Sequence, residues 1–277
     1  MPELPEVEVV RTGLEPLLQG RRIVSVTSSG SLLRYPLPDL ASLCGNVVRK
    51  IDRRSKYLIF YFEHLAESFD SQVLIWHLGM TGQFYVLDSA VEAGKHEHVR
   101  FDFDDGSTLR YRDARRFGYA GLSPEVSWQK ARWFAALGPE PLSHDFDVSY
   151  FYRRCQGRKV PIKSFVMDAN VVVGVGNIYA SESLFKAGIH PKRLAGNISK
   201  ARVENLLIAI QETLRAAIVA GGSTISDFVR VDGEPGYFAH DFKVYGREGE
   251  PCCMCGDRIR RLIQSGRSTF YCANCQH

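Results

Sequence analysis

Four cysteines near the C-terminus carry the clearest chemical signal in the chain. Cys252, Cys255, Cys272 and Cys275 form two C-x2-C pairs with sixteen residues between them. Two pairs at this separation place four thiolates at the corners of a tetrahedron, which is the geometry of a structural Zn²⁺ site. Disulfides would instead require an oxidising compartment, and nothing else in the sequence indicates one. The pattern therefore predicts one structural zinc ion.

The insert between the two cysteine pairs is strongly basic. It carries one acid, Asp257, and a turn signal at Ser265-Gly266, so it reads as a two-stranded finger. Its arginines are Arg258, Arg260, Arg261 and Arg267. A small metal-bound finger of this charge is suited to approach a polyanion, which favours a nucleic acid as partner. The plainer alternative is a zinc staple with a solvated charged face.

The other chemical signal is the first six residues, Met-Pro-Glu-Leu-Pro-Glu. A small second residue normally permits removal of Met1, which would leave Pro2 with a free secondary amine. An α-amino group, with a pKa of about 7.7–8.0 against about 10.4 for lysine, is the better nucleophile near neutral pH. Glu3 lies beside it as a candidate general acid or base. Glutamates are also common at helix N-termini for electrostatic reasons alone.

Composition fits a globular protein of one large domain or two ordinary ones. The 277 residues are 45% hydrophobic and 24% charged, with a net charge of +4. The charge is uneven, because residues 1–148 hold 17 basic and 20 acidic side chains and residues 149–277 hold 18 and 11. The basic half is where we expect nucleic acid to be held most strongly. Acidic residues at the N-terminus and seven cysteines favour a reducing cytoplasm over export.

Hydrophobic periodicity predicts a helix followed by many short strands in the first half. Val7, Val10, Leu14 and Leu17 recur at helical spacing, and Gly20 is a stop signal. Strands are expected at 23–26, 47–51, 57–62, 73–78, 83–87, 99–103 and 109–111. The turn 79–82 is expected to join two of them, and Asp105-Gly106 two others. A β-sandwich with the helix docked on it is the predicted architecture.

The second half is predicted to be helical before the finger begins. Residues 137–148 resemble an interdomain linker, and 161–169 are a candidate helix. Asn177 is expected to cap a helix over 178–187, and Ser199 a long helix to Ala220. These segments predict a β-sandwich domain over 1–136, a linker over 137–148, a helical domain over 149–242 and a zinc finger over 243–277.

Several longer motifs together resemble one known family. They are Met-Pro-Glu-Leu-Pro-Glu-Val-Glu at 1–8, Arg-Arg-Ser-Lys-Tyr-Leu at 53–58, His-Leu-Gly-Met-Thr-Gly at 77–82, Asp-Ala-Arg-Arg-Phe-Gly at 113–118, Leu-Gly-Pro-Glu-Pro-Leu at 137–142, Val-Gly-Val-Gly-Asn-Ile-Tyr-Ala-Ser-Glu at 173–182, Tyr-Phe at 237–238, Val-Tyr-Gly-Arg at 244–247 and the cysteine finger. This set resembles formamidopyrimidine-DNA glycosylase over the whole chain.

The resemblance implies a bifunctional base-excision repair enzyme that binds duplex DNA. Such an enzyme removes oxidised purines, namely 8-oxoguanine and formamidopyrimidines, and cuts the abasic strand by β,δ-elimination. It also implies an α+β fold with an N-terminal β-sandwich, a helix–two-turn–helix domain and a β-hairpin zinc finger. We expect a monomer in the cytoplasm, associated with the bacterial nucleoid.

The resemblance also assigns roles to individual residues. Pro2 is the expected nucleophile, Glu3 the proton donor, and Lys56 and Arg267 basic groups near the sugar and its phosphates. Met80, Arg115 and Phe117 are expected to fill the space left by the extruded nucleotide. The further DNA contacts are His77, Arg116, Asn177, Tyr245 and Arg258. Glu6 and Ser226 are the expected lesion-recognition residues, although the loop around Ser226 varies and some members have lysine there.

Other interpretations compete with these assignments. Taken alone, Phe117 is more typical of a core, His77 of a structural histidine, and Asn177 of a helix cap. At the level of the whole chain, an endonuclease VIII-like enzyme for oxidised pyrimidines is the nearest alternative. A non-catalytic zinc-finger protein and an N-terminal-proline tautomerase are more distant ones, since the chain has Pro2, Glu3, Lys56 and a cysteine quartet together.

Overall fold

The computed structural model describes residues 1–63, 71–88, 90–223 and 242–277. The chain divides into two compact units. The first comprises Met1–Ala135 and the short returning segment at 221–223, and the second comprises Ala136–Ala220 and the described residues from Phe242 onward. Among the described helices, none is long and apolar enough to cross a membrane.

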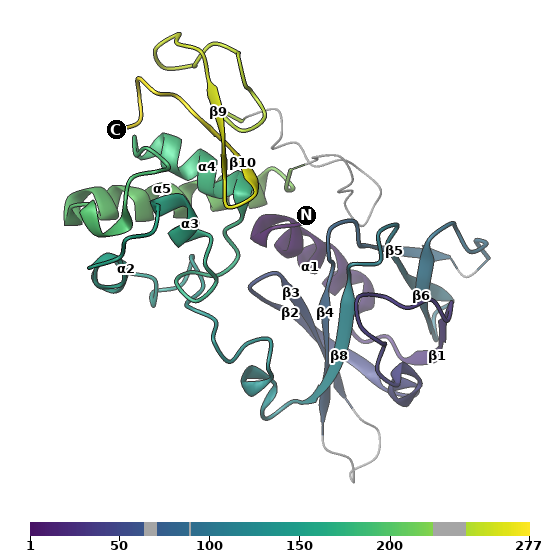
Figure 1. Ribbon diagram of the computed structural model, residues 1–277. Coiled ribbons are helices and arrows are strands. Elements are labelled where there is room, and N and C mark those ends of the chain that lie inside the picture. The colour runs from purple at the N-terminus through teal and green to yellow at the C-terminus, as the bar shows by residue number, and fades with distance from the viewer. Residues whose placement is uncertain (64–70, 89, 224–241) are drawn as a thin grey trace. The chain divides into compact units, whose positions relative to one another are not determined.

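The first unit is a β-sandwich of two four-stranded antiparallel sheets, as predicted (Figure 1). The strand orders are β1-β6-β7-β5 and β2-β3-β4-β8. The strands are β1 (Ile23–Ser28), β2 (Val47–Arg54), β3 (Tyr57–Glu63), β4 (Gln72–His77), β5 (Gln83–Asp88), β6 (Glu97–Phe103), β7 (Ser107–Arg112) and β8 (Tyr119–Pro124). Two 3-10 turns, η1 (Leu40–Leu43) and η2 (Trp128–Lys130), lie in the connections.

The core of this unit lies between the sheets and beneath helix α1 (Leu4–Leu18). Trp76 is fully buried, with its ring 4.7 Å from that of Tyr111 and 5.1 Å from that of Phe84. The predicted helix is confirmed, but its last buried residue is Leu18, because Leu17 is 44% exposed. The helix therefore anchors the N-terminus of the chain firmly on the sandwich.

Three connections run from one sheet to the other, at residues 29–46, 78–82 and 113–118, and the two short ones are called the crossings. Residues 79–82 were predicted to form a tight turn between two strands, and residues 78–82 link β4 in one sheet to β5 in the other. Residues 113–118 link β7 back to β8, a strand that the periodicity analysis missed. His77 pairs with Tyr119, and Gln83 pairs with Arg112. Both crossings thus start and end at paired positions and run side by side.

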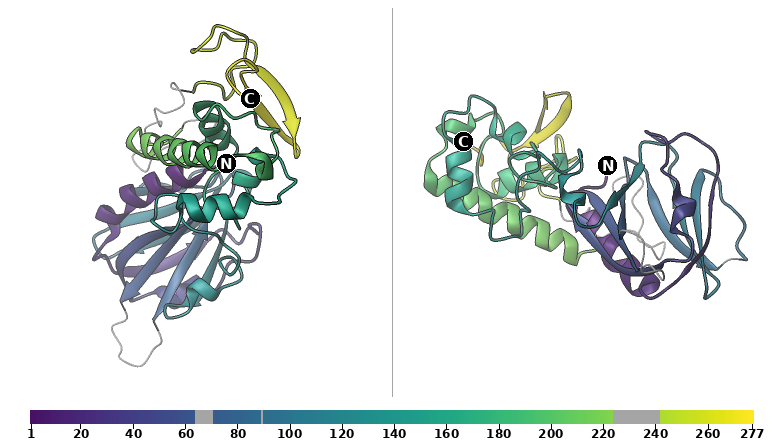
Figure 2. Two further views of the ribbon diagram at one scale, coloured as in Figure 1. Left: turned by 90° about the vertical axis from the view of Figure 1, so that its left-hand side faces the viewer. Right: turned by 90° about the horizontal axis from the view of Figure 1, so that it is seen from below.

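The second unit combines helices with a two-stranded hairpin (Figure 2). Its helices are α2 (Val148–Cys155), α3 (Ile162–Val166), α4 (Asn177–Lys186) and α5 (Lys200–Val219), with the 3-10 turn η3 (Ala195–Asn197) before α5. Helix α3 is shorter than predicted, whereas the expected cap of α5 is confirmed: the Ser199 hydroxyl accepts the Arg202 N–H at 3.4 Å. Helix α5 packs against α2 and α4.

The finger hairpin joins β9 (Arg260–Gln264) to β10 (Arg267–Tyr271) (Figure 2). Ser265 and Gly266 form its two-residue turn, as predicted, and both have positive φ, at 50° and 72°. A turn with two left-handed residues matches the twist of a two-stranded ribbon. The hairpin packs on helix α4 through β10.

Candidate active site and nucleic-acid interface

The N-terminus of helix α1 is held by two buried acids. Glu3 is 3% exposed and Glu6 is 2% exposed. One Glu6 carboxylate oxygen accepts the backbone N–H of Glu3 at 2.8 Å, and the other accepts the N–H and the hydroxyl of Ser223 at 2.9 and 2.8 Å. Pro2 is buried next to Glu3, whereas Met1 is exposed. Glu6 and Ser223 therefore hold the turn that carries Pro2 and Glu3, the residues expected to react.

Glu6 is placed differently from a free recognition group. Both of its oxygens accept hydrogen bonds from the chain itself, which gives this side chain a positioning role for the N-terminal turn. Its expected part in lesion recognition stays a prediction. Ser226, the other residue expected in that role, lies outside the described residues.

Lys56 lies in the two-residue turn between β2 and β3, next to Ser55, whose φ is +57°. The turn is tied to helix α1 through Arg53. The Arg53 guanidinium donates to the Glu8 carboxylate at 2.7 Å and to the Ser55 carbonyl at 2.8 Å. Burial opposes ionisation of Glu8, but Arg11 and Arg53 outweigh it and lower the Glu8 pKa. Lys56 thus lies in a turn whose position is fixed against helix α1, the helix that Glu3 immediately precedes.

His77 ends strand β4 within an aromatic cluster. Its ring stacks on Tyr119, with centroids 4.9 Å apart and an interplanar angle of 11°, and Tyr57 meets it edge-on. Burial, with smaller contributions from Lys56 and Arg34, lowers the pKa of His77 to about 3. The imidazole is therefore neutral near pH 7. Its Nδ1 accepts the Gly79 N–H at 3.0 Å, so Nε2 carries the proton and can donate to a phosphate oxygen.

The low pKa of His77 predicts a pH-dependent stability. Unfolding restores a pKa near 6.5, so the unfolded chain binds a proton that the folded chain does not, and stability falls as the pH drops below about 6.5. The expected slope from this residue is up to about 1.4 kcal/mol per pH unit. In His77→Asn, whose side-chain oxygen can still accept the Gly79 N–H, urea unfolding between pH 4 and about 6 should lose that slope. An unchanged slope would assign the pH dependence to other groups.

The two crossings between the sheets present the three expected wedge residues. Arg115 and Phe117 are exposed, and the Arg115 guanidinium lies 4.8 Å from the centre of the Phe117 ring. Phe117 is 42% exposed, so the core interpretation of this residue is wrong. Met80 is half-buried on the neighbouring crossing. An apolar pair beside a cation is suited to insertion between base pairs.

Arg116 has a left-handed backbone, with φ at +56°. This conformation is uncommon for a residue other than glycine and often marks a functional site. It bends the second crossing between Arg115 and Phe117 and leaves the Arg116 side chain exposed. A phosphate contact by Arg116 is compatible with this exposure and stays a prediction.

Asn177 does not cap helix α4, and that part of the sequence analysis was wrong. Gly176 is the N-cap, and Asn177 is the first helical residue. Its amide oxygen accepts from the Lys163 ammonium at 2.6 Å, and its amide nitrogen donates to the Ser268 carbonyl at 3.0 Å and the Tyr245 hydroxyl at 3.3 Å. The side chain therefore joins the helix to the finger.

Two buried charged residues that the sequence analysis missed organise this part of the second unit. Lys163, 2% exposed, also donates to the Thr269 hydroxyl of β10 at 2.7 Å. Glu182 accepts three consecutive backbone N–H groups, from 243 to 245, at 2.8–3.0 Å. Burial raises the pKa of Glu182, and the three N–H groups oppose that shift. Lys163 occurs singly in an apolar stretch of helix and Glu182 ends the 173–182 motif, but neither signal identifies the partner of the residue.

The structure brings Asn177 and Tyr245 together. Arg267 lies next to them in the fold, because it directly precedes Ser268, whose carbonyl accepts a hydrogen bond from the Asn177 amide. Arg267 is exposed beside a cavity of about 190 Å³. The cavity is lined by Lys163, Ser164, Met167, Asp168, Gln264, Ser265 and Arg267. Arg258 is exposed on the finger, where its guanidinium reaches the Gly249 carbonyl at 3.5 Å. These basic and amide groups are suited to hold a sugar–phosphate backbone.

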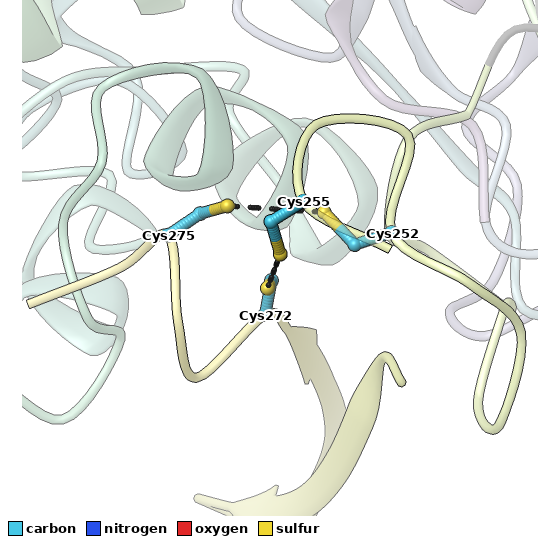
Figure 3. A group of neighbouring side chains, drawn as sticks. All are labelled: Cys252, Cys255, Cys272 and Cys275. Carbon is cyan, nitrogen blue, oxygen red and sulfur yellow. Dashed lines mark hydrogen bonds between the residues drawn. The ribbon is translucent and has the colours of Figure 1, made fainter. Parts of the chain in front are cut away.

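The four cysteines converge in the manner that the sequence predicts (Figure 3). Their sulfur atoms all lie within 4.8 Å of one another; Cys252 and Cys275 are 3.9 Å apart, and Cys255 and Cys272 are 3.5 Å apart. Sulfur atoms around a tetrahedral zinc, with Zn–S near 2.3 Å, are separated by about 3.8 Å. The donor set therefore fits one structural Zn²⁺.

In the absence of zinc, the surroundings shift the pKa values of two of the thiols in opposite directions. A hydrogen bond from Asn274, helped by the Asp257 backbone, lowers the pKa of Cys255 to about 7, whereas burial and the other three thiols raise the pKa of Cys275.

The finger has a small core, made by Phe185, Val244, Cys252, Ile259 and Cys272. Since this core is small, the metal must contribute much of the stability of the finger.

Family comparisons agree with this two-part arrangement. The formamidopyrimidine-DNA glycosylase N-terminal domain matches residues 1–120, the H2TH domain of the same enzyme matches 137–229, and the zinc finger found in FPG and IleRS matches 249–277. A formamidopyrimidine-DNA glycosylase of Idiomarina loihiensis is 48% identical over 277 residues and covers 100% of both chains. The chain belongs to the formamidopyrimidine-DNA glycosylase family.

Other members of the formamidopyrimidine-DNA glycosylase family are similarly close. The protein of that name from Cupriavidus pinatubonensis is 48% identical over 285 residues, with 100% of both chains covered. A crystal structure of a Lactococcus lactis FPG mutant with Fapy-dG-containing DNA has a TM-score of 0.91 at 33% identity, and covers 99% of both chains. MutM with carbocyclic 8-oxo-G-containing DNA has a TM-score of 0.90 at 34% identity. The family and the fold that the sequence motifs implied are thus confirmed.

Proposed function

We propose that this protein is a base-excision repair glycosylase that removes 8-oxoguanine and formamidopyrimidines from duplex DNA and then cleaves the abasic strand. The observation that carries the proposal is the N-terminal turn. Pro2 and Glu3 are buried there, in a family whose solved members bind Fapy-dG, 8-oxoguanine analogues and abasic sites. Glu6 holds that turn through the Glu3 N–H, which keeps the reacting groups in place.

The reaction begins at the amine of Pro2 after Met1 is removed. The nitrogen lone pair forms a bond to C1′ of the extruded nucleotide, the bond from C1′ to the base breaks, and the proton that the amine nitrogen loses neutralises the departing base. Glu3 delivers a proton to the ring oxygen of the sugar, so the ring opens and a Schiff base remains. Loss of a proton from C2′ then expels the 3′ phosphate, and a second elimination expels the 5′ phosphate.

The remaining groups hold the DNA during these steps. Lys56 and His77, at the ends of neighbouring strands, donate to the backbone next to the lesion. Asn177, Tyr245 and Arg267 form the corresponding contacts on the second unit. The zinc site, held by the four cysteines, takes no part in bond breaking and fixes the finger that carries Arg258 and Arg267.

Borohydride trapping tests the proposal directly. The protein is incubated with a duplex that carries one 8-oxoguanine opposite cytosine, and borohydride reduces the Schiff base to a stable amine. We expect a covalent protein–DNA adduct whose tryptic map places the link at Pro2. An abasic duplex and an oxidised-pyrimidine duplex are run in parallel. Trapping on the pyrimidine duplex alone would favour the endonuclease VIII-like alternative, and no adduct on any duplex would favour a silent DNA-binding protein.

The basic residues of the interface predict a steep salt dependence. Four cationic candidates, Lys56, Arg116, Arg258 and Arg267, imply about four neutralised phosphates and a slope of log K against log salt near −3.6. Affinity should fall roughly 150-fold between 50 and about 200 mM salt. In Arg267→Ala the slope should become shallower by about 0.9, whereas Arg261→Ala should change it less, because Arg261 is already paired with Glu248 at 2.8 Å. If the affinity of the unmodified protein does not change with salt concentration, these residues do not neutralise phosphates.

The substrate sets the place of action. We place the enzyme in the cytoplasm with the chromosomal DNA of the nucleoid, as a monomer. Co-sedimentation of the protein with isolated nucleoids at low salt, and its release at high salt, is the expected result.

A further inference from the structure

Asp113 is fully buried where the two crossings of the sandwich meet. One of its carboxylate oxygens accepts the Thr81 hydroxyl at 2.5 Å and the Arg115 N–H at 3.3 Å. The other accepts the Gly118 N–H at 2.8 Å and the Tyr111 hydroxyl at 3.1 Å. The single side chain thus holds one residue of the 78–82 crossing and two of the 113–118 crossing.

Thr81 completes the link between the crossings. Its hydroxyl donates to Asp113 and accepts the Arg115 N–H at 3.1 Å. Tyr111 adds a second link, because its hydroxyl also reaches the Leu78 carbonyl at 3.2 Å. Burial and the nearby Asp113 raise the pKa of Tyr111, so this hydroxyl keeps its proton and acts as a donor.

Glycines bring the two crossings into direct backbone contact. Gly79 has φ at +71°, and a Cβ added there would lie 2.4 Å from the backbone nitrogen of Gly118. A Cβ added at Gly118 would lie 1.7 Å from the Tyr111 hydroxyl. Backbone approach this close leaves the crossings no room to move independently.

We propose that Asp113 and Thr81 form a latch that positions the wedge of Met80, Arg115 and Phe117. The inference rests on the proposed function and extends it to two residues to which no DNA contact is assigned. Met80 belongs to one crossing, and Arg115 and Phe117 to the other, so only a rigid link between the crossings makes them enter the duplex as one unit. Without the latch, each of the three side chains would lose conformational entropy separately when it enters the duplex, and insertion would be less favourable.

The latch acts on one step of the reaction. When a paired purine is extruded, it loses its base pair and its stacking contacts, and the wedge must replace them. An abasic nucleotide has no base, so it loses neither. Weakening the latch should therefore slow excision of paired 8-oxoguanine and spare strand cleavage at an abasic site. A general loss of folding would lower both activities together.

The test compares Thr81→Val, which removes the hydroxyl at constant size, with Thr81→Ser, which retains it. Under single-turnover conditions with saturating enzyme, Thr81→Val should excise 8-oxoguanine roughly 10- to 100-fold more slowly, and Thr81→Ser within about threefold of the unmodified rate. Abasic cleavage and borohydride trapping on the abasic duplex should stay within about threefold in both. 2-Aminopurine placed next to the cytosine that pairs with the lesion should report slower wedge insertion in Thr81→Val and an unchanged rate in Thr81→Ser.

Ser25→Ala is the matched control, because it removes another hydroxyl-to-carboxylate bond of the same sandwich, at 2.6 Å to Asp102. It should leave both activities unchanged. The latch is refuted if Thr81→Val excises 8-oxoguanine at the unmodified rate, or if it loses abasic cleavage by the same factor. If the unmodified protein itself forms no adduct with any duplex, the proposed function fails first, and the two failures are thereby distinguished.

Discussion

Replacing Pro2 with glycine is expected to slow base excision by roughly 10- to 100-fold without weakening DNA binding. Glycine keeps an α-amino group of similar pKa, so a nucleophile remains. It loses the ring that fixes the position of the amine next to Glu3, and a mobile amine reaches C1′ in fewer productive orientations. Single-turnover excision of 8-oxoguanine measures the loss, and fluorescence anisotropy of a labelled duplex measures the affinity.

Removal of Met1 must be verified in both proteins, and intact-mass measurement does so. Glycine, like proline, is small enough to permit removal, so the comparison is matched. A Leu17→Ala variant, at the exposed end of helix α1, controls for changes in the helix itself and should react at the unmodified rate. Equal excision by Pro2→Gly and the unmodified protein would remove the Pro2 ring from the mechanism, and loss of binding would make its role structural.

The sequence predicted most elements of each unit, because those elements are locally encoded, whereas helix α2 (Val148–Cys155) and strand β8 were not predicted. Alternation of apolar residues predicted seven of the strands, and Gly20 and Ser199 marked helix ends where the structure has them. The strand β8 was missed because Tyr119–Pro124 contains Gly121 and Pro124, which weaken a strand pattern. Its role depends on pairing with β4 across the sheet, which no local signal reveals.

The supporting contacts of the site could not be predicted in the same way. Lys163 binds Thr269, which lies 106 residues away, and Glu182 binds Val244, which lies 62 residues away. A charged residue in an apolar helix indicates burial, but its partner is chosen by the tertiary fold. Asn177 was predicted from its neighbours in sequence to cap helix α4, but its amide binds the finger instead. The cysteine quartet was predictable because spacing alone fixes its geometry.

Replacing Cys272 with serine is expected to have the largest effect on DNA binding. Cys272 is fully buried in the finger core and supplies one of the four converging thiols. A serine oxygen is a weaker zinc ligand, and three thiolates hold zinc less tightly than four. An isolated two-stranded hairpin is marginal in water, so the hairpin β9–β10 should lose its order together with the metal. Affinity for duplex DNA should fall at least about a hundredfold.

The loss reaches beyond the arginines of the finger. Ser268 and Thr269 on β10 hold the Asn177 amide and the Lys163 ammonium, so disorder of the hairpin also releases the candidate phosphate contact on helix α4. Cys253→Ser is the matched control, because Cys253 is exposed and stands outside the quartet; it should retain one zinc per chain and full affinity. Zinc content by a chromophoric chelator and anisotropy with duplex DNA give the two readouts. Full DNA binding by a zinc-free Cys272→Ser protein would show that the finger neither grips DNA nor positions Asn177.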